Sequence, residues 1–544
     1  MRPRVVALAG AVGVSTGLLV AGFEELASAL LEALHDLPIG VQAVAPTAGL
    51  VLAWVLLHFG ARRASPATAD EYIRSFHDTG RRLDLRPVPA RMAAAVATLG
   101  LGGSLGYEGP AIYAGSAVGT WFHTRFRRLV SPDDTKVLLV AGAAAGVAAI
   151  FKAPVTGLVF ALEVPYQDDL ARRMLLPAAI ASASSYVTFA AIGGTEPILR
   201  VAGDPPFGLV DLGGAALVGL VCGLLARAFV RLVGLAKRIG GAGAAWVRLP
   251  AAGATLALCL LGSRLLAGET LTLGPGYDAV RWAMDPERGL WAVIALGSLR
   301  VVATVATVGG GGVGGLFIPL VLQGAFVGRA VGALFAEANA TLFPVVGIAA
   351  FLGAGYRVPL AAVVFVAEFT GRPGFVVPGL IAAVVAQLVM GRDSISPYQV
   401  AGRVGHLERR LDMGIAGVID AEARTAPPDT TLEELFWNHL VGTRQRSVAV
   451  VDGARYLGMV VADDLAVLER EAWSSLTVAD VMRTGGPVAA PSWTVRDAVR
   501  AMERGDVDRL AVCDGERFVG VVGSADIVRL DEILDRIEGG PATS

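Results

Sequence analysis

The chain has little cysteine, histidine or charge. Its 544 residues include three cysteines and six histidines, and only 17% of the residues are charged. Three widely spaced cysteines provide neither a disulfide framework nor the ligand spacing of a metal site. The histidines form no His-Glu-x-x-His motif, which excludes an intramembrane zinc protease. A formal net charge of -2 leaves no basic footprint for nucleic acid.

Apolar residues and glycine are abundant instead. Apolar residues make up 54% of the chain, the mean hydropathy is +0.60, and there are 68 glycines. This composition is too apolar for an average soluble protein, and small residues allow membrane helices to pack closely. The N-terminus resembles a signal peptide, with Arg2 and Arg4 before an apolar run. Because Glu24 and Glu25 follow without a small-residue cleavage site, we interpret this segment as a first membrane helix with a cytoplasmic N-terminus.

Apolar segments recur over the first 390 residues, and several reach the roughly 20 residues that a membrane-spanning helix needs. Four of them are interrupted by a proline, at Pro110, Pro154, Pro319 and Pro359. A broken helix at membrane depth has backbone amides that lipid cannot satisfy, so it is tolerated only where it is buried in protein or lines a polar path. We therefore predict an all-α polytopic membrane protein with a transport pathway.

The composition changes at about residue 405. Charged residues return, and alternating strands such as residues 447–451 appear beside amphipathic helical stretches. We predict a transmembrane domain over residues 1–404 and a soluble α/β domain over residues 405–544. Basic connections at residues 62–91 and 125–128 are predicted to face the cytoplasm.

The sequence contains two internal repeats. Residues 149–163 align with residues 354–368 at a constant offset of 205, and Pro, Val, Phe and Glu coincide. In both copies an aromatic and then a basic residue precede the proline. A duplicated half with proline-broken segments in corresponding places indicates a transporter-like binding site between the repeats. In the C-terminal domain, residues 457–465 are echoed by residues 519–527.

A carboxylate stands beside the first proline break. Glu108 precedes Gly109-Pro110 and has apolar segments on both sides. Capping of the helix N-terminus is one interpretation. However, a carboxylate at membrane depth is costly and indicates function, and the glycine amides around it suit an anion. Since carboxylate and anion compete for these amides, Glu108 is a candidate gate that opens by protonation or displacement.

A second glycine-rich turn, residues 309–315, leads into a proline-started helix with open amides. Close helix packing is an alternative explanation, and the missing Lys-Ser/Thr argues against a phosphate-binding loop. The two segments resemble motifs of the CLC family of chloride channels and proton/chloride antiporters with a C-terminal CBS domain pair. Gly106–Pro110 is similar to its G-(K/R)-E-G-P motif, with Tyr107 at the basic position. Gly314–Pro319 is similar to G-G-x-F-x-P.

The resemblance implies two inverted repeats with broken helices, a homodimer with one pore per subunit, and Glu108 as the gate. It implies a multi-pass protein of the cell membrane with cytoplasmic CBS domains at about residues 413–470 and 476–535. The expected ligand is chloride or a similar anion, no cofactor is required, and no enzyme activity is expected. The anion-binding positions that it implies are Gly106, Tyr107, Gly109, Leu316 and Phe317.

Two family positions have no clear match. The first anion motif, G-S-G-I-P, belongs about 40 residues before the gate, where Ser65 and Thr68 are candidates for the hydroxyl and ungapped spacing allows Ala67. The pore tyrosine matches either Tyr398 or Ser396, and in the latter case Tyr398 lies outside the pore. Loss of either group would loosen anion coordination.

A third departure concerns proton coupling. Proton-coupled members of the family usually carry an acidic residue directly after the position of Glu163, although some exchangers lack it. This chain has Val164 there, as channels do. An ordinary lipid or core contact is the alternative interpretation of Val164, and Glu163 is predicted to be structural. The residues therefore favour a voltage-gated-type chloride channel with a glutamate gate. The alternatives are a proton-coupled chloride or fluoride antiporter and, more distantly, a CBS-regulated divalent-cation transporter.

In the C-terminal repeats, Asp464 and Asp526 stand where nucleotide-binding CBS pairs have a ribose-contacting aspartate. Val461 and Gly523 occupy the preceding position, where Thr or Ser is usual. The resemblance thus implies a possible adenine nucleotide site, with a structural or dimerising tail as the alternative.

Overall fold

The computed structural model describes residues 3–78, 83–131, 134–196, 198–199, 207–285, 287–335, 341–402, 411–441 and 446–529. The chain forms two compact units, Met1–Arg403 and Val404–Ser544. The domain boundary predicted at residue 404, and the last residues of the predicted second CBS domain, lie outside the described residues.

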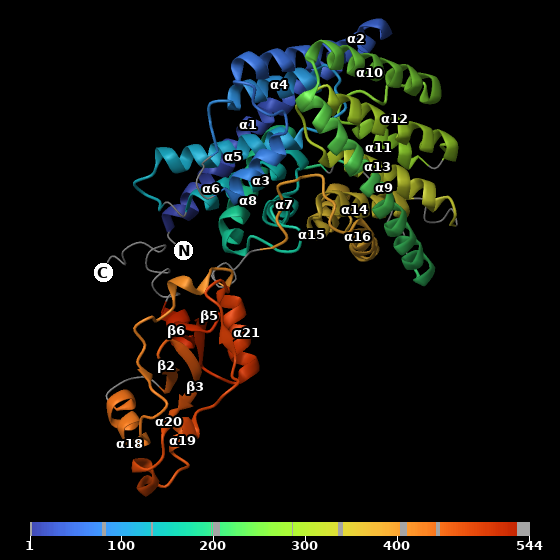
Figure 1. Ribbon diagram of the computed structural model, residues 1–544. Coiled ribbons are helices and arrows are strands. Elements are labelled where there is room, and N and C mark those ends of the chain that lie inside the picture. Colours follow the sequence, from blue (N-terminus) through green and yellow to red (C-terminus); the bar gives the residue numbers. More distant parts are fainter. Residues whose placement is uncertain are drawn as a thin grey trace. The chain divides into compact units, whose positions relative to one another are not determined.

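The first unit is helical (Figure 1). Among the described residues, eight helices are long and apolar enough to cross a membrane, some together with a short flanking turn. These helices are α1 (Pro3–His35), α2 (Ile39–Val55), α6 (Asp134–Phe151), α8 (Leu175–Gly193), α9 (Leu209–Ala242), α10 (Ala245–Ala267), α12 (Leu290–Gly309) and α16 (Val376–Met390). The other helices are α3 (Thr68–His77), α4 (Val88–Gly100), α5 (Glu108–Arg125), α7 (Pro154–Glu163), α11 (Tyr277–Met284), α13 (Phe317–Gly332), α14 (Leu342–Tyr356) and α15 (Pro359–Thr370).

The 205-residue repeat is visible in the helix boundaries. α6 ends at Phe151 and α14 ends at Tyr356, and each is followed by a helix that begins at a proline. The residues after these ends, Lys152 and Arg357, adopt left-handed φ angles of 50° and 55°. A left-handed residue terminates a helix, and proline suits the first turn of the next one. The two predicted helix breaks, before Pro154 and Pro359, therefore have the same local structure.

Two glutamates join the repeats reciprocally. Glu163, the last residue of α7, accepts hydrogen bonds from the amides of Leu360 and Ala361 at 3.2 and 2.8 Å, in the first turn of α15. Glu368 on α15 accepts hydrogen bonds from two amides of the first turn of α7 at 3.0 and 2.7 Å. Each carboxylate thus satisfies free amides at a positive helix end. Glu163 has the structural role expected of it.

We expect Glu163→Gln and Glu368→Gln each to lower the free energy of unfolding by about 1.5–3 kcal/mol, because each replaces an ionised acceptor of backbone amides. Chemical unfolding of the detergent-solubilised protein measures this change. Glu32→Gln, at an exposed position on α1, is the matched control. Unfolding curves that coincide with the wild type for both variants would contradict the reciprocal capping.

The second unit holds a six-stranded sheet in the order β1-β2-β3-β6-β5-β4. Its strands are β1 (Thr425–Ala426), β2 (Ser447–Asp452), β3 (Arg455–Val461), β4 (Val488–Ala489), β5 (Arg509–Asp514) and β6 (Arg517–Gly523). The α-helices with described bounds in this unit are α18 (Leu432–Leu435), α19 (Ala462–Leu465), α20 (Val478–Val481) and α21 (Val495–Gly505).

The sheet consists of two similar halves. In each half a short strand pairs in parallel with the first strand of a hairpin, and the two hairpins meet through β3 and β6. Gly453 and Gly515, with φ angles of 60° and 63°, occupy the first position of the two-residue hairpin loops. Glycine is favoured there because the turn requires a positive φ. Each half has its own apolar core, which explains the sequence repeat.

Candidate functional site

The two glycine motifs meet in space. The amide of Gly106 donates to the carbonyl of Gly315 at 2.9 Å, and the amide of Gly315 donates to the carbonyl of Gly106 at 2.7 Å. This pairing brings together the first turns of α5 and α13, which begin at Glu108 and Phe317. Helix N-termini present unpaired amides and a positive dipole end. The arrangement therefore suits an anion between the two halves of the unit.

Glu108 occupies this position itself. Its side chain is buried, and its Oε1 accepts a hydrogen bond from the amide of Phe317 at 2.6 Å. Its Oε2 is buried without a hydrogen-bond partner among the described residues. A Cβ on Gly106 would lie 1.9 Å from Oε2, and one on Gly315 would lie 2.0 Å from Oε1. Any side chain at Gly106 or Gly315 would overlap with the Glu108 carboxylate, so both positions require glycine.

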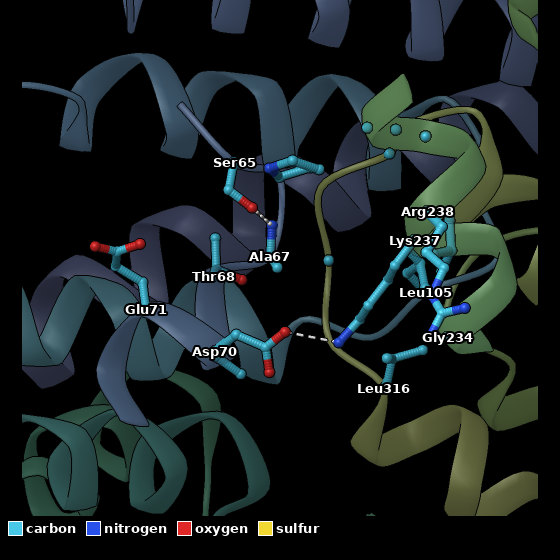
Figure 2. A pocket seen from close by; sticks show the side chains of 18 of the residues that line it. Ser65, Ala67, Thr68, Asp70, Glu71, Leu105, Gly234, Lys237, Arg238 and Leu316 are labelled. Carbon is cyan, nitrogen blue, oxygen red and sulfur yellow. Dashed lines mark hydrogen bonds and ion pairs between the residues drawn. The ribbon is translucent and has the colours of Figure 1, made fainter. Parts of the chain in front are cut away.

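The structure places one of the candidate hydroxyls beside Gly109, the residue that follows Glu108. Thr68 begins α3, is fully buried, and its Oγ1 has no partner among the described residues. That oxygen is 2.7 Å from where a Cβ on Gly109 would lie. Ser65 instead accepts a hydrogen bond from the amide of Ala67 at 3.2 Å, within its own loop (Figure 2). Thr68, and neither Ser65 nor Ala67, contributes a hydroxyl next to the glycine motifs.

The segment that was expected to hold the pore tyrosine is arranged differently. Ser396 is buried, and its hydroxyl accepts a hydrogen bond from the amide of Tyr398 at 3.4 Å. The side chain of Tyr398 is 42% exposed. Among the described residues, neither Ser396 nor Tyr398 forms a hydrogen bond with Glu108 or Phe317, although Tyr398 lines a cavity that Gly315 and Leu316 also line.

Tyr356, which sequence reasoning missed, lies at the inner end of this cavity. It is 3% exposed, and its ring packs 5.5 Å from that of Phe160 and 6.5 Å from that of Phe317. Its phenol lies near the Leu316 backbone, and both residues line the same cavity. A signal was present in the sequence, because an aromatic residue precedes the basic residue in both repeats. Only the second copy is a tyrosine; Phe151 in the first copy has no hydroxyl.

The cavity has a volume of about 1000 Å³ and connects these buried groups with an exposed cationic mouth. Thr68, Leu316 and Tyr356 line it inside, and Arg63 and Arg238 line it at its exposed end. It opens beside the basic connection predicted to face the cytoplasm. A positively charged entrance concentrates anions in preference to cations.

Val164 is buried at the end of α7. Its carbonyl accepts a hydrogen bond from Nε2 of Gln399 at 2.8 Å, and the same amide group donates to the carbonyl of Tyr356 at 2.7 Å. The valine side chain brings no titratable group to this region, and its position is part of the packed core.

The C-terminal aspartates have different surroundings. Asp464 accepts two hydrogen bonds from Arg483 at 2.7 and 2.5 Å, and this pairing raises the pKa of the guanidinium. Asp526 accepts a hydrogen bond from the amide of Gly523 at 3.0 Å. A cavity of about 760 Å³ in this unit is lined by other described residues, including Asp463 and Arg483. Of the two aspartates, Asp464 is thus already paired with a cation.

Two segments of the chain match known families. Residues 48–391 match the family described as voltage gated chloride channel, and residues 478–532 match the CBS domain. The putative chloride channel protein ClcB-like of Ralstonia nicotianae is 28% identical over 409 residues, which cover 70% of this chain and 92% of that protein. The H(+)/Cl(-) exchange transporter ClcA of Yersinia pseudotuberculosis is 27% identical over 420 residues, which cover 72% of this chain and 86% of that protein.

Solved structures with the same fold include a slow cyanobacterial Cl-/H+ antiporter, with a TM-score of 0.64, 22% identity and coverage of 72% of this chain and 95% of that one. A CLC-type fluoride/proton antiporter has a TM-score of 0.64, 23% identity and coverage of 73% and 98%. These likenesses confirm the predicted fold class, a helical CLC-type membrane unit followed by an α/β CBS region. The chain is therefore a multi-pass membrane protein that belongs to the voltage-gated chloride channel family, the CLC family of chloride transport proteins.

Proposed function

We propose that this protein exchanges chloride, or a similar small anion, for protons across the membrane, with Glu108 as both gate and proton carrier. The observation that supports this most directly is that the two carboxylate oxygens differ in their hydrogen bonding. Oε1 accepts a hydrogen bond from the amide of Phe317, and Oε2 is buried without a partner among the described residues. Ionised, the carboxylate blocks an anion position; protonated, it binds the amide less well and yields to an anion. Proton and anion thus compete for one place.

The sequence alone favoured a channel because of Val164. The relatives and solved structures favour exchange, since several are named as proton/chloride exchangers or antiporters. We therefore propose that the inner proton route uses a group other than residue 164. A channel is the second candidate, and the observation that favours it is the buried apolar side chain of Val164.

In this proposal the anion is held by amides of the two glycine motifs, with Phe317 as the amide that Glu108 vacates. The hydroxyls come from Thr68 and from Tyr356 in the place expected for Tyr398 or Ser396. Thr68 offers a buried hydroxyl without a partner among the described residues, and Tyr356 offers a phenol beside Leu316. Hydroxyl and amide donors can replace the hydration of a chloride ion without adding fixed charge.

We also propose a homodimer in the cell membrane, with the N-terminus and the CBS region in the cytoplasm, in agreement with the basic connections. Adenine nucleotide binding by two CBS domains stays a prediction for the C-terminal unit. The pairing of Asp464 with Arg483 favours a structural role for that aspartate.

The test is a simultaneous recording of proton and chloride movement in liposomes that contain the purified wild-type protein. We expect an outward chloride gradient to drive protons inward against their own gradient. Chloride movement with no proton movement, at any membrane potential, would establish the channel instead. Repeating the recording with fluoride and nitrate in place of chloride identifies the preferred anion.

A further inference from the structure

A lysine bridges the two walls of the cavity below the anion site. Lys237, near the C-terminal end of α9, reaches across to Asp70 on α3 (Figure 2). Its Nζ lies 2.6 Å from Oδ2 of Asp70 and donates a second hydrogen bond to the carbonyl of Ile395 at 3.0 Å. The side chains of Lys237 and Asp70 are 25% and 9% exposed, so the pair is largely shielded from bulk water.

Both partners of this lysine belong to segments that also carry the anion site. Asp70 stands two residues after Thr68 on α3, in the first turn of that helix. The amide of Ile395 donates to the carbonyl of Gly355 at 2.9 Å, directly before Tyr356. All of these residues except Gly355 line the same cavity. Lys237 therefore connects the two walls of this cavity. One wall carries the Thr68 hydroxyl, and the other carries the Tyr356 phenol.

Two other partly buried charged groups of the cavity are engaged elsewhere. Arg248 donates to the carbonyl of Gly310 at 2.6 Å, and Glu71 lies 3.5 Å from Arg91. An ammonium has three N–H donors, and the interactions above use two of those of Lys237. Among the described residues, the third N–H has no recorded acceptor. Lys237 is thus a cation with spare donor capacity on the route to the anion site.

We propose that Lys237 is an anion-binding gate of the inner passage, which exchanges the Asp70 carboxylate for the transported anion. At rest, the ion pair cancels the negative charge that Asp70 would otherwise place two residues from Thr68. An incoming anion competes with Asp70 for the ammonium through a charge-assisted hydrogen bond. It then passes on to Thr68 and Tyr356, and the lysine returns to the aspartate. This proposal rests on the proposed anion transport, but it does not depend on proton coupling.

Two substitutions with opposite expected effects test the proposal. Lys237→Met removes the cationic ligand and should weaken chloride binding about tenfold. Asp70→Asn removes the competing carboxylate and should strengthen chloride binding about threefold or more. Titration calorimetry with sodium chloride on the purified full-length protein measures the chloride affinity of each variant. The chloride dependence of liposome flux provides a second readout.

The control is Arg264→Met, at an exposed position in the last turn of α10 and outside the cavity lining; we expect less than about a twofold change. If Lys237→Met does not fold, as judged by gel filtration, Lys237→Arg keeps the charge and should retain chloride binding. Weaker binding in both Lys237→Met and Asp70→Asn would show a purely structural bridge and overturn the proposal. Unchanged binding in Lys237→Met would overturn it as well.

These outcomes are separable from the proposed exchange function. A wild-type protein that moves chloride without protons refutes exchange, yet its chloride affinity can still respond to Lys237→Met. Conversely, coupled exchange with unchanged affinity in Lys237→Met leaves the exchange function intact and refutes the lysine gate alone.

Discussion

Replacing Glu108 with glutamine is expected to abolish proton coupling and to leave an anion flux that does not vary with pH. The amide side chain can neither ionise nor carry a proton, so the competition with the anion for the Phe317 amide no longer depends on pH. Anion flux and proton flux in liposomes, recorded between about pH 3 and about pH 7.5, measure the effect. This range extends to both sides of the ordinary glutamate pKa of about 4.3.

Glu163→Gln is the matched control for this experiment, since Glu163 is a second buried carboxylate of the same unit. Its two oxygens are both held by backbone amides of α15. We expect Glu163→Gln to keep proton coupling and the pH dependence of the wild type. Wild-type coupling in Glu108→Gln would remove Glu108 from the mechanism.

The second large effect is expected for Gly315→Ala, which should lower chloride flux by roughly a hundredfold, as small displacements of a reactive group can do. The added Cβ would lie 2.0 Å from Oε1 of Glu108 and 2.5 Å from the amide nitrogen of Gly109. Either the Glu108 side chain or the Gly109 backbone must move, and the backbone of a buried first turn is hard to displace. The carboxylate would leave the Phe317 amide, and the pairing with Gly106 would open.

Gly309→Ala provides the comparison, because a Cβ there would find its nearest neighbour at 3.9 Å, an ordinary contact distance. We expect this variant to transport chloride like the wild type at equal amounts of reconstituted protein. Wild-type flux in Gly315→Ala would mean that the close approach of the two glycine loops is not required for transport.

The local features of this protein were predictable because they depend on neighbours in the sequence. Helix starts at prolines, apolar segments of spanning length and the alternating strands of the tail are set by short-range preferences. The carboxylate at Glu108 stood out for the same reason, as its apolar flanks are visible in one stretch of sequence. The CLC resemblance through Gly106–Pro110 and Gly314–Pro319 rested on such stretches.

The contacts between distant segments were not predictable in this way. Thr68 could not be distinguished from Ser65 by spacing, because the choice depends on which hydroxyl lies against Gly109. Tyr356 was overlooked because its phenol meets Leu316 only after α13 and α14 have packed together. The expected tyrosine segment drew attention to Tyr398, whose side chain is partly exposed.

By itself, the sequence determined the class of this protein: a polytopic membrane unit with a duplicated, proline-broken half, a buried carboxylate predicted to be its gate, and an α/β tail. Hydropathy, helix-start signals and repeat spacing are written in consecutive residues, so one sequence is enough to identify them. Only the tertiary structure decided which hydroxyls and amides lie near Glu108 and Phe317, along the proposed anion path, and that Lys237 meets Asp70. These groups are far apart along the chain, and side-chain packing and hydrogen bonding between separate helices alone bring them together.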